Sequence, residues 1–144
     1  MVINSFTNNF NIEGKINVDE TNLKMKISQN CPMTTKSLTK TESVLIKYLP
    51  TIFSCQCFND ANNSFRDECK NTEIGHLFEH IMLEHLCIEK LADGNLNAEF
   101  EGRTSWEKDN TNVFYIKIKA GKKEIKTIQK AFTKSINLLE KIYN

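Results

Sequence analysis

The three histidines of this chain lie between positions 76 and 85, on a segment that reads as one helix from about Thr72 to Leu91. Thr72 or Asn71 suits the N-cap, and Asp93-Gly94 is typical of a helix end. At about 100° per residue, one arc of this helix is apolar and is expected to face the core. That arc holds Ile74, Leu77, Phe78, Ile81 and Ile88. The chain must therefore offer a large apolar partner to this helix.

The sequence His76-Leu77-Phe78-Glu79-His80 is an H-x-x-E-H pentad, the inverted form of a zinc-protease motif. Residues four apart share one face of a helix, so His76 and His80 can offer both imidazoles to one ion. Glu79 lies beside this pair, where a carboxylate takes the proton from a metal-activated water. The spacing predicts a zinc site with two histidine ligands and a catalytic base.

Glu84 follows His80 by four residues and extends the histidine stripe. Towards Leu91 this stripe becomes apolar, so we expect the helix to be buried nearly all round and Glu84 to line a cleft. A buried carboxylate needs a cation or several donors. A metal shared with the histidines meets that need, and Arg103 is the other candidate partner. His85 points into the core arc and is expected to be structural.

Other interpretations of the chemistry-bearing residues stay open. A His-Glu cluster on a helix is also compatible with a structural domain in which these side chains form a hydrogen-bonded network. Cys55-Gln56-Cys57 has the C-x-C spacing of a metal pair, but without a second pair we expect buried or idle thiols. Trp106 either stacks on a substrate or packs at the end of a hairpin.

Hydrophobic periodicity predicts strands in two parts of the chain. Residues 1–30 alternate with a period of two, which favours strands. The alternating apolar residues are Ile12, Ile16, Val18, Leu23, Met25 and Ile27. Two further strands are expected at about 95–102 and 112–119, joined as a hairpin through the polar residues 109–112.

Two more helices complete the pattern. One is expected at 37–49, with Leu38, Leu45 and Leu49 on one side and Pro50 at its end. The last begins near Lys122 and has an apolar stripe of Ile125, Ile128, Phe132, Leu139 and Ile142. Residues 51–71 are polar, with a loop at 59–64. The predicted architecture is α+β: an antiparallel sheet of about four strands with about three packed helices.

Composition limits the functional classes. With 144 residues, 40% hydrophobic and 26% charged, the chain suits a single domain over 1–144. A net charge of +1 gives no electrostatic case for nucleic acid or an anionic membrane. No apolar run approaches the roughly 18 residues of a membrane helix, and no signal peptide is visible. Five cysteines, an odd number, favour reduced thiols in the cytoplasm.

Residues 75–84, GHLFEHIMLE, resemble a stretch of the N-terminal domain of cyanophycin synthetases, which tends to read G-H-x-x-E-H-x-x-L-E. Leu49-Pro50 with Cys57 downstream is similar to the family's leucine-proline segment and following cysteine. Gly102-Arg103-Thr104 before a strand resembles its glycine-arginine-threonine turn. The likeness covers roughly residues 23–140, which is nearly the whole chain.

This resemblance implies His76, His80 and Glu84 as metal ligands and Glu79 as the base. In some of these synthetases the domain is a metal-dependent hydrolase that cuts cyanophycin, an aspartate polymer with arginine on each side-chain carboxyl. The synthetases also carry an ATP-grasp and a Mur-ligase-like domain, so a stand-alone domain without a phosphate loop is not expected to polymerise. Ser105 replaces a second arginine, and Glu101 an apolar or aromatic residue, which leaves substrate recognition open.

The leading hypothesis is a zinc-dependent hydrolase of a peptide-like bond, in cyanophycin or a related Asp-rich peptide. Glu79 moves the protons, and Arg103 holds a substrate carboxylate through its planar fork. The alternative is a non-catalytic module that binds cyanophycin-like polymer or a synthetase partner. Neither interpretation involves nucleic acid or a membrane, and a homo-oligomer stays open.

Overall fold

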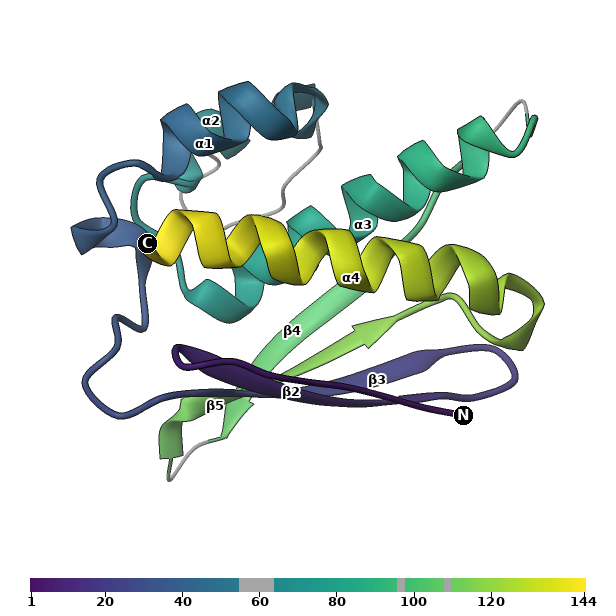
Figure 1. The fold of residues 1–144 in the computed structure, drawn as a ribbon, viewed down its shortest axis with the longest axis horizontal. Coiled ribbons are helices and arrows are strands. Elements are labelled where there is room, and N and C mark those ends of the chain that lie inside the picture. Colours follow the sequence, from purple (N-terminus) through teal and green to yellow (C-terminus); the bar gives the residue numbers. More distant parts are fainter. Residues whose placement is uncertain (55–63, 96–97, 108–109) are drawn as a thin grey trace.

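The computed structural model describes residues 1–54, 64–95, 98–107 and 110–144. Its strands form one antiparallel sheet in the order β1-β2-β3-β5-β4 (Figure 1). The strands are β1 (Val2–Phe6), β2 (Phe10–Ile16), β3 (Thr21–Ile27), β4 (Gly102–Glu107) and β5 (Asn110–Ile118). The α+β class is confirmed, with five strands rather than about four. The extra strand is β1. Only Ile3 is buried in it, so the sequence has no apolar alternation there that would predict a strand.

All the helices cover one face of this sheet (Figure 1). They are α1 (Thr41–Tyr48), α2 (Phe65–Glu68), α3 (Ile74–Ala92) and α4 (Ile125–Tyr143), with short 3₁₀ turns at η1 (Thr35–Ser37), η2 (Pro50–Ser54) and η3 (Lys122–Glu124). The long helices α3 and α4 lie side by side against the sheet, and α1 and α2 lie above them. No helix of the described part of the chain covers the other face of the sheet.

The core lies between the sheet and the two long helices. The inward side chains of β2 and β3 are buried, and they alternate with exposed ones as expected. The predicted stripe of the last helix is confirmed for Ile128, Phe132, Leu139 and Ile142, which are buried, and Ile125 is partly buried at the start of α4. Val18, by contrast, is 64% exposed in the turn between β2 and β3 and is not a core residue.

Helix α3 begins and ends close to the predicted residues. Its N-cap is Glu73, without a side-chain cap, rather than Thr72 or Asn71, because Thr72 is engaged elsewhere. Its end at Asp93 is followed by Gly94 with a φ of 92°, as helix-ending glycines commonly show. Gly75 has no side chain to separate α3 from β5, since a Cβ there would lie 2.4 Å from Cγ of Phe114.

The predicted burial of α3 is right in its first half and wrong for Ile88 and Leu91 near its C-terminal end. Ile74, Leu77, Phe78 and Ile81 are fully buried. Ile88 and Leu91 are 37% and 49% exposed, because the last turns of α3 extend past the elements that cover the first turns (Figure 1). The expectation that α3 is buried nearly all round is therefore wrong.

Two predicted boundaries were wrong. Residues 37–40 are not part of α1, because Thr41 donates its hydroxyl to the Leu38 carbonyl in a separate turn. The strand expected at 95–102 lies instead at 102–107. Residues 98–101 first run back along α3, where the Cys87 thiol donates to the Ala98 carbonyl. The Cys55-Gln56-Cys57 pair, the loop at 59–63 and Asp109 lie outside the described residues.

Candidate functional site

The two histidines of the pentad face one another on α3. Nε2 of His76 lies 3.1 Å from Nε2 of His80, and their rings meet nearly at right angles. Two nitrogens bound to one tetrahedral zinc at about 2.0–2.1 Å are separated by roughly 3.3 Å. The helical spacing therefore brings the two imidazoles to nearly the separation that a shared ion requires.

Neighbouring side chains fix the orientation of each histidine. The Thr72 hydroxyl lies 2.9 Å from Nδ1 of His76, one turn earlier in the chain. A hydroxyl that accepts from Nδ1–H leaves Nε2 with its lone pair, which is the form that binds a metal. On the other side, the Phe65 ring of α2 lies 4.6 Å from the His80 ring. Burial, and then the nearby His76, lower the pKa of His80 to about 4, so His80 is neutral at pH 7.

Glu79 is the buried carboxylate of the site. It is only 6% exposed, and its Oε1 accepts a hydrogen bond of 2.6 Å from the Thr104 hydroxyl on β4. Gly102 allows this close approach, because a Cβ there would lie 3.1 Å from Cγ of Glu79. Burial raises the pKa of Glu79, and the Thr104 hydrogen bond and His76 oppose that rise. Glu79 is therefore a better proton acceptor than an exposed glutamate.

Glu84 does not occupy the buried position that its surroundings on the helical wheel predict. It is only partly buried, and its Oε1 accepts a hydrogen bond of 2.7 Å from Thr51 of η2. The prediction was wrong because Ile88 and Leu91, the apolar residues that lie near Glu84 on the wheel in the following turns, are exposed. Arg103 is not its partner, because Arg103 lies on the face of β4 that points away from α3, the helix that carries Glu84.

The fit to a metal ion is partial. The two imidazole nitrogens and the Thr72 hydroxyl match two ligands and an outer-sphere partner. Among the residues that the structure describes, however, no three His, Cys, Asp or Glu side chains are grouped so as to hold an ion. Neither Glu79 nor Glu84 completes a set of three with the histidines in this conformation.

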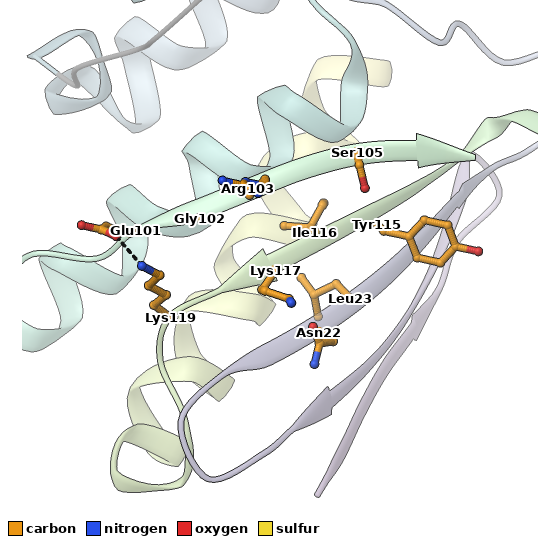
Figure 2. Close-up of a pocket in the computed structure, with 10 residues that line it drawn as sticks. All are labelled: Asn22, Leu23, Glu101, Gly102, Arg103, Ser105, Tyr115, Ile116, Lys117 and Lys119. Atoms are coloured by element: carbon orange, nitrogen blue, oxygen red, sulfur yellow. Dashed lines mark hydrogen bonds and ion pairs between the residues drawn. The ribbon is translucent and has the colours of Figure 1, made fainter. Parts of the chain in front are cut away.

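Arg103 projects from the opposite face of β4. Gly102 and Thr104 face α3, and Arg103 alternates with them and pairs with Lys117 of β5 on the helix-free face. It lines a hollow of about 470 Å³ on that face, together with Tyr115 and Lys117 (Figure 2). The histidines are not among the residues that line this hollow. The structure thus separates Arg103 from His76, Glu79 and His80.

The structure shows where Trp106 and His85 lie. Trp106 pairs with the inward-facing Phe114, yet it is 56% exposed, so it lies at the rim of the sheet rather than in the core. His85 is structural, as expected: it is buried, and its Nδ1 lies 2.9 Å from the Ser135 hydroxyl of α4. Burial, and next the charge of Lys134, lower the pKa of His85 to about 4.

Sequence reasoning missed the residues that hold the site from outside α3. Thr72 stands four residues before His76, and this spacing is a readable signal for a side chain that reaches a histidine. Thr104 and Gly102 share one face of their strand, and a small residue there signals close approach of a helix. Phe65 gave no signal, because its contact with His80 joins segments without a shared pattern.

Comparison with known proteins identifies the family. A family model described as the cyanophycin synthase-like N-terminal domain matches residues 22–144. The match includes α3 and the β4–β5 hairpin, and it begins at β3. No curated protein sequence matches the chain. In the described part of the chain, no helix combines the length and apolarity that crossing a membrane requires. Since most of its residues match the family model, the chain belongs to this family, and the resemblance is confirmed.

Proposed function

We propose that this chain is a zinc-dependent hydrolase of peptide-like bonds that acts on cyanophycin or a related aspartate-rich peptide. The observation that carries the proposal is the facing pair of imidazole nitrogens, 3.1 Å apart, one residue away from a buried carboxylate. Histidine nitrogens with one carboxylate are a common ligand set of catalytic zinc. Membership of the cyanophycin synthase-like family supports an amide-linked aspartate polymer as the substrate class.

The side chains of α3 and β4 divide the work of hydrolysis. A bound zinc ion would supply a polarised water that loses its proton near neutral pH. Glu79 takes this proton, because its desolvated carboxyl has a raised pKa, and later returns it to the leaving amine. Thr104 holds Oε1, which leaves Oε2 as the oxygen that exchanges the proton. Thr72 orients His76, and the Phe65 ring covers His80.

Metal analysis tests the ligand pair. Protein purified without a chelator and without a histidine tag is expected to carry one zinc ion per chain. His76→Ala and His80→Ala should each remove it, because a single imidazole with one carboxylate is a weak site. His85→Gln is the matched control, since His85 lies on the same helix but faces α4. Full zinc occupancy in both alanine variants would show that the pair is not the site.

Turnover tests the reaction. The assay is release of short peptides from an Asp-Arg polymer in the presence of zinc. Glu79→Gln should keep the fold and the metal and lose about a hundredfold or more in rate, because the amide cannot accept the proton. A variant that retains the wild-type rate would remove Glu79 from the role of base.

The second candidate is a non-catalytic module that binds cyanophycin-like polymer or a synthetase partner. It is favoured by the missing third ligand in the described conformation and by the hollow beside Arg103 on the helix-free face. Zinc binding without turnover on any Asp-Arg substrate, together with binding of the polymer, would replace the hydrolase by this module.

A further inference from the structure

Strand β4 is an open edge of the sheet directly below the candidate site. It is the last strand in the sheet order, and no described strand lies beyond it. Glu79 lies against its backbone at Gly102 and bonds the side chain of Thr104. On α3, the histidines lie between Glu79, which faces β4, and Glu84, which faces η2. This flank of the helix points away from α4, which contacts α3 through Phe78 and His85 on the far side.

The backbone of β4 offers hydrogen-bonding groups at this edge. Lys119 donates its N–H to the Glu101 carbonyl at 2.9 Å, so these two residues form a hydrogen-bonded pair. Because such pairs alternate along an antiparallel ladder, Arg103 and Ser105 also direct their N–H and C=O groups to β5. Gly102 and Thr104 then direct theirs to the open edge. An extended amide chain supplies matching donors and acceptors.

Side chains at the two faces of the edge add selectivity. The exposed Trp106 lies on the helix side, the same side as Thr104. The exposed Arg103 lies on the other side, and no ion pair among the described residues involves it. Its acidic neighbour Glu101 pairs with Lys119 at 2.9 Å (Figure 2). A guanidinium in this position suits a carboxylate on an approaching chain.

We propose that the substrate binds as an added β-strand on the open edge of β4. Its backbone bonds Gly102 and Thr104, and its side chains alternate between Trp106 on the helix side and Arg103 on the helix-free side. The occupant is an extended peptide chain that carries carboxylates. This inference rests on the proposed function, because the added strand carries the scissile bond past the histidines and Glu79. Arg103 thereby becomes a specificity-determining residue, and it does not touch the reacting atoms.

Amide hydrogen exchange tests the added strand directly. The probe is a short synthetic peptide with an aspartate backbone and arginine on its side-chain carboxyls, mixed with zinc and the Glu79→Gln variant to prevent cleavage. The amides of Gly102 and Thr104 should become protected on binding. Those of Arg103 and Ser105 should change little, because they are already bonded within the sheet. The single tryptophan, Trp106, should also become less accessible to acrylamide quenching.

Kinetic variants give an independent test. Trp106→Ala and Arg103→Ala should each raise KM about tenfold with kcat nearly unchanged, as loss of a binding contact does. Arg103→Lys should restore only part of the loss, because lysine lacks the planar fork. Phe6→Ala is the control: Phe6 is an exposed aromatic residue on β1, at the opposite edge of the sheet from β4.

The outcomes separate this inference from the proposed function. Turnover with neither alternating protection nor a rise in KM overturns the added strand and leaves the hydrolase standing. If the wild type neither binds zinc nor cleaves the polymer, the proposed function falls. In that case the exchange experiment still tests whether a peptide binds at the edge of β4. Alternating protection supports the added strand, and its absence overturns it.

Discussion

The hydrogen bond between Thr104 and Glu79 should stabilise the fold as well as the site. The perturbation is Thr104→Val, which keeps the shape of the side chain and removes the hydroxyl. The lost bond is 2.6 Å long and its acceptor is a carboxylate that is only 6% exposed. Hydrogen bonds to charged groups contribute about 1.5–3 kcal/mol, and Thr104 is only partly buried, so a loss of ~1.5 kcal/mol is expected.

A double-mutant cycle isolates this bond. Thr104→Val, Glu79→Met and the double variant are unfolded by urea at pH 7 with a chelator, so that no metal contributes. The expected coupling free energy is about 1–2 kcal/mol, because Thr104→Val should cost little once the carboxylate has been removed. Thr21→Val is the control, since its hydroxyl donates to the Ala120 carbonyl at 2.8 Å and does not touch Glu79.

One result would refute the reasoning. If the coupling between Thr104 and Glu79 is within ~0.3–0.5 kcal/mol of zero, like that of the Thr21 control, the carboxylate does not depend on β4 for its position. The variant also has a direct electrostatic consequence. Because the Thr104 hydrogen bond lowers the pKa of Glu79, Thr104→Val should raise that pKa further and shift the acid limb of the pH–rate profile upwards.

Three further outcomes are expected. The buried His85 has a pKa of about 4 against a usual value near 6.5, so the unfolded chain binds more protons in this range, and stability should fall from pH 6.5 to pH 4. His85→Gln should make that loss smaller in urea titrations at several pH values, and the part due to His80, whose pKa is also about 4, should remain. Gly75→Ala should lower stability by about 1–2 kcal/mol, because its Cβ meets Phe114 at 2.4 Å and overpacking outweighs the helix propensity of alanine. Zinc at a hundred times its Kd should stabilise the wild type by about 2.7 kcal/mol and leave His80→Ala unaffected; equal thermal shifts would exclude His80 as a ligand.

Local patterns predicted what depends on a single element. The i, i+4 spacing of His76 and His80 is enough to bring their nitrogens together, because a helix fixes that geometry wherever it packs. The amphipathic stripe of the last helix and the alternation of β2 and β3 likewise needed no tertiary information. These parts of the fold and of the site follow from periodicity.

The missed features depend on how elements meet. The burial of Glu84 was mispredicted because the wheel treats the whole of α3 alike, whereas Ile88 and Leu91 near its C-terminal end are exposed. The side of the sheet on which Arg103 lies could not be predicted, because it depends on where β4 begins. With the strand at 102–107, Thr104 reaches Glu79 and Arg103 faces away. Because side chains alternate along a strand, a shift of β4 by one residue would exchange the faces on which Thr104 and Arg103 lie.

Energetics assign the two carboxylates to different roles. To join the histidines, Glu84 has to release its hydrogen bond to the exposed Thr51, and a typical intramolecular hydrogen bond contributes about 0.5–1.5 kcal/mol. Glu79 has to leave a buried position and the short bond to Thr104, which costs more. Glu84 is therefore the expected third ligand, and Glu79 stays in place to move protons. Glu84→Gln should weaken zinc binding at least tenfold in a chelator competition, whereas Glu79→Gln should retain zinc. If Glu79→Gln loses the metal and Glu84→Gln does not, the two carboxylates have the opposite roles.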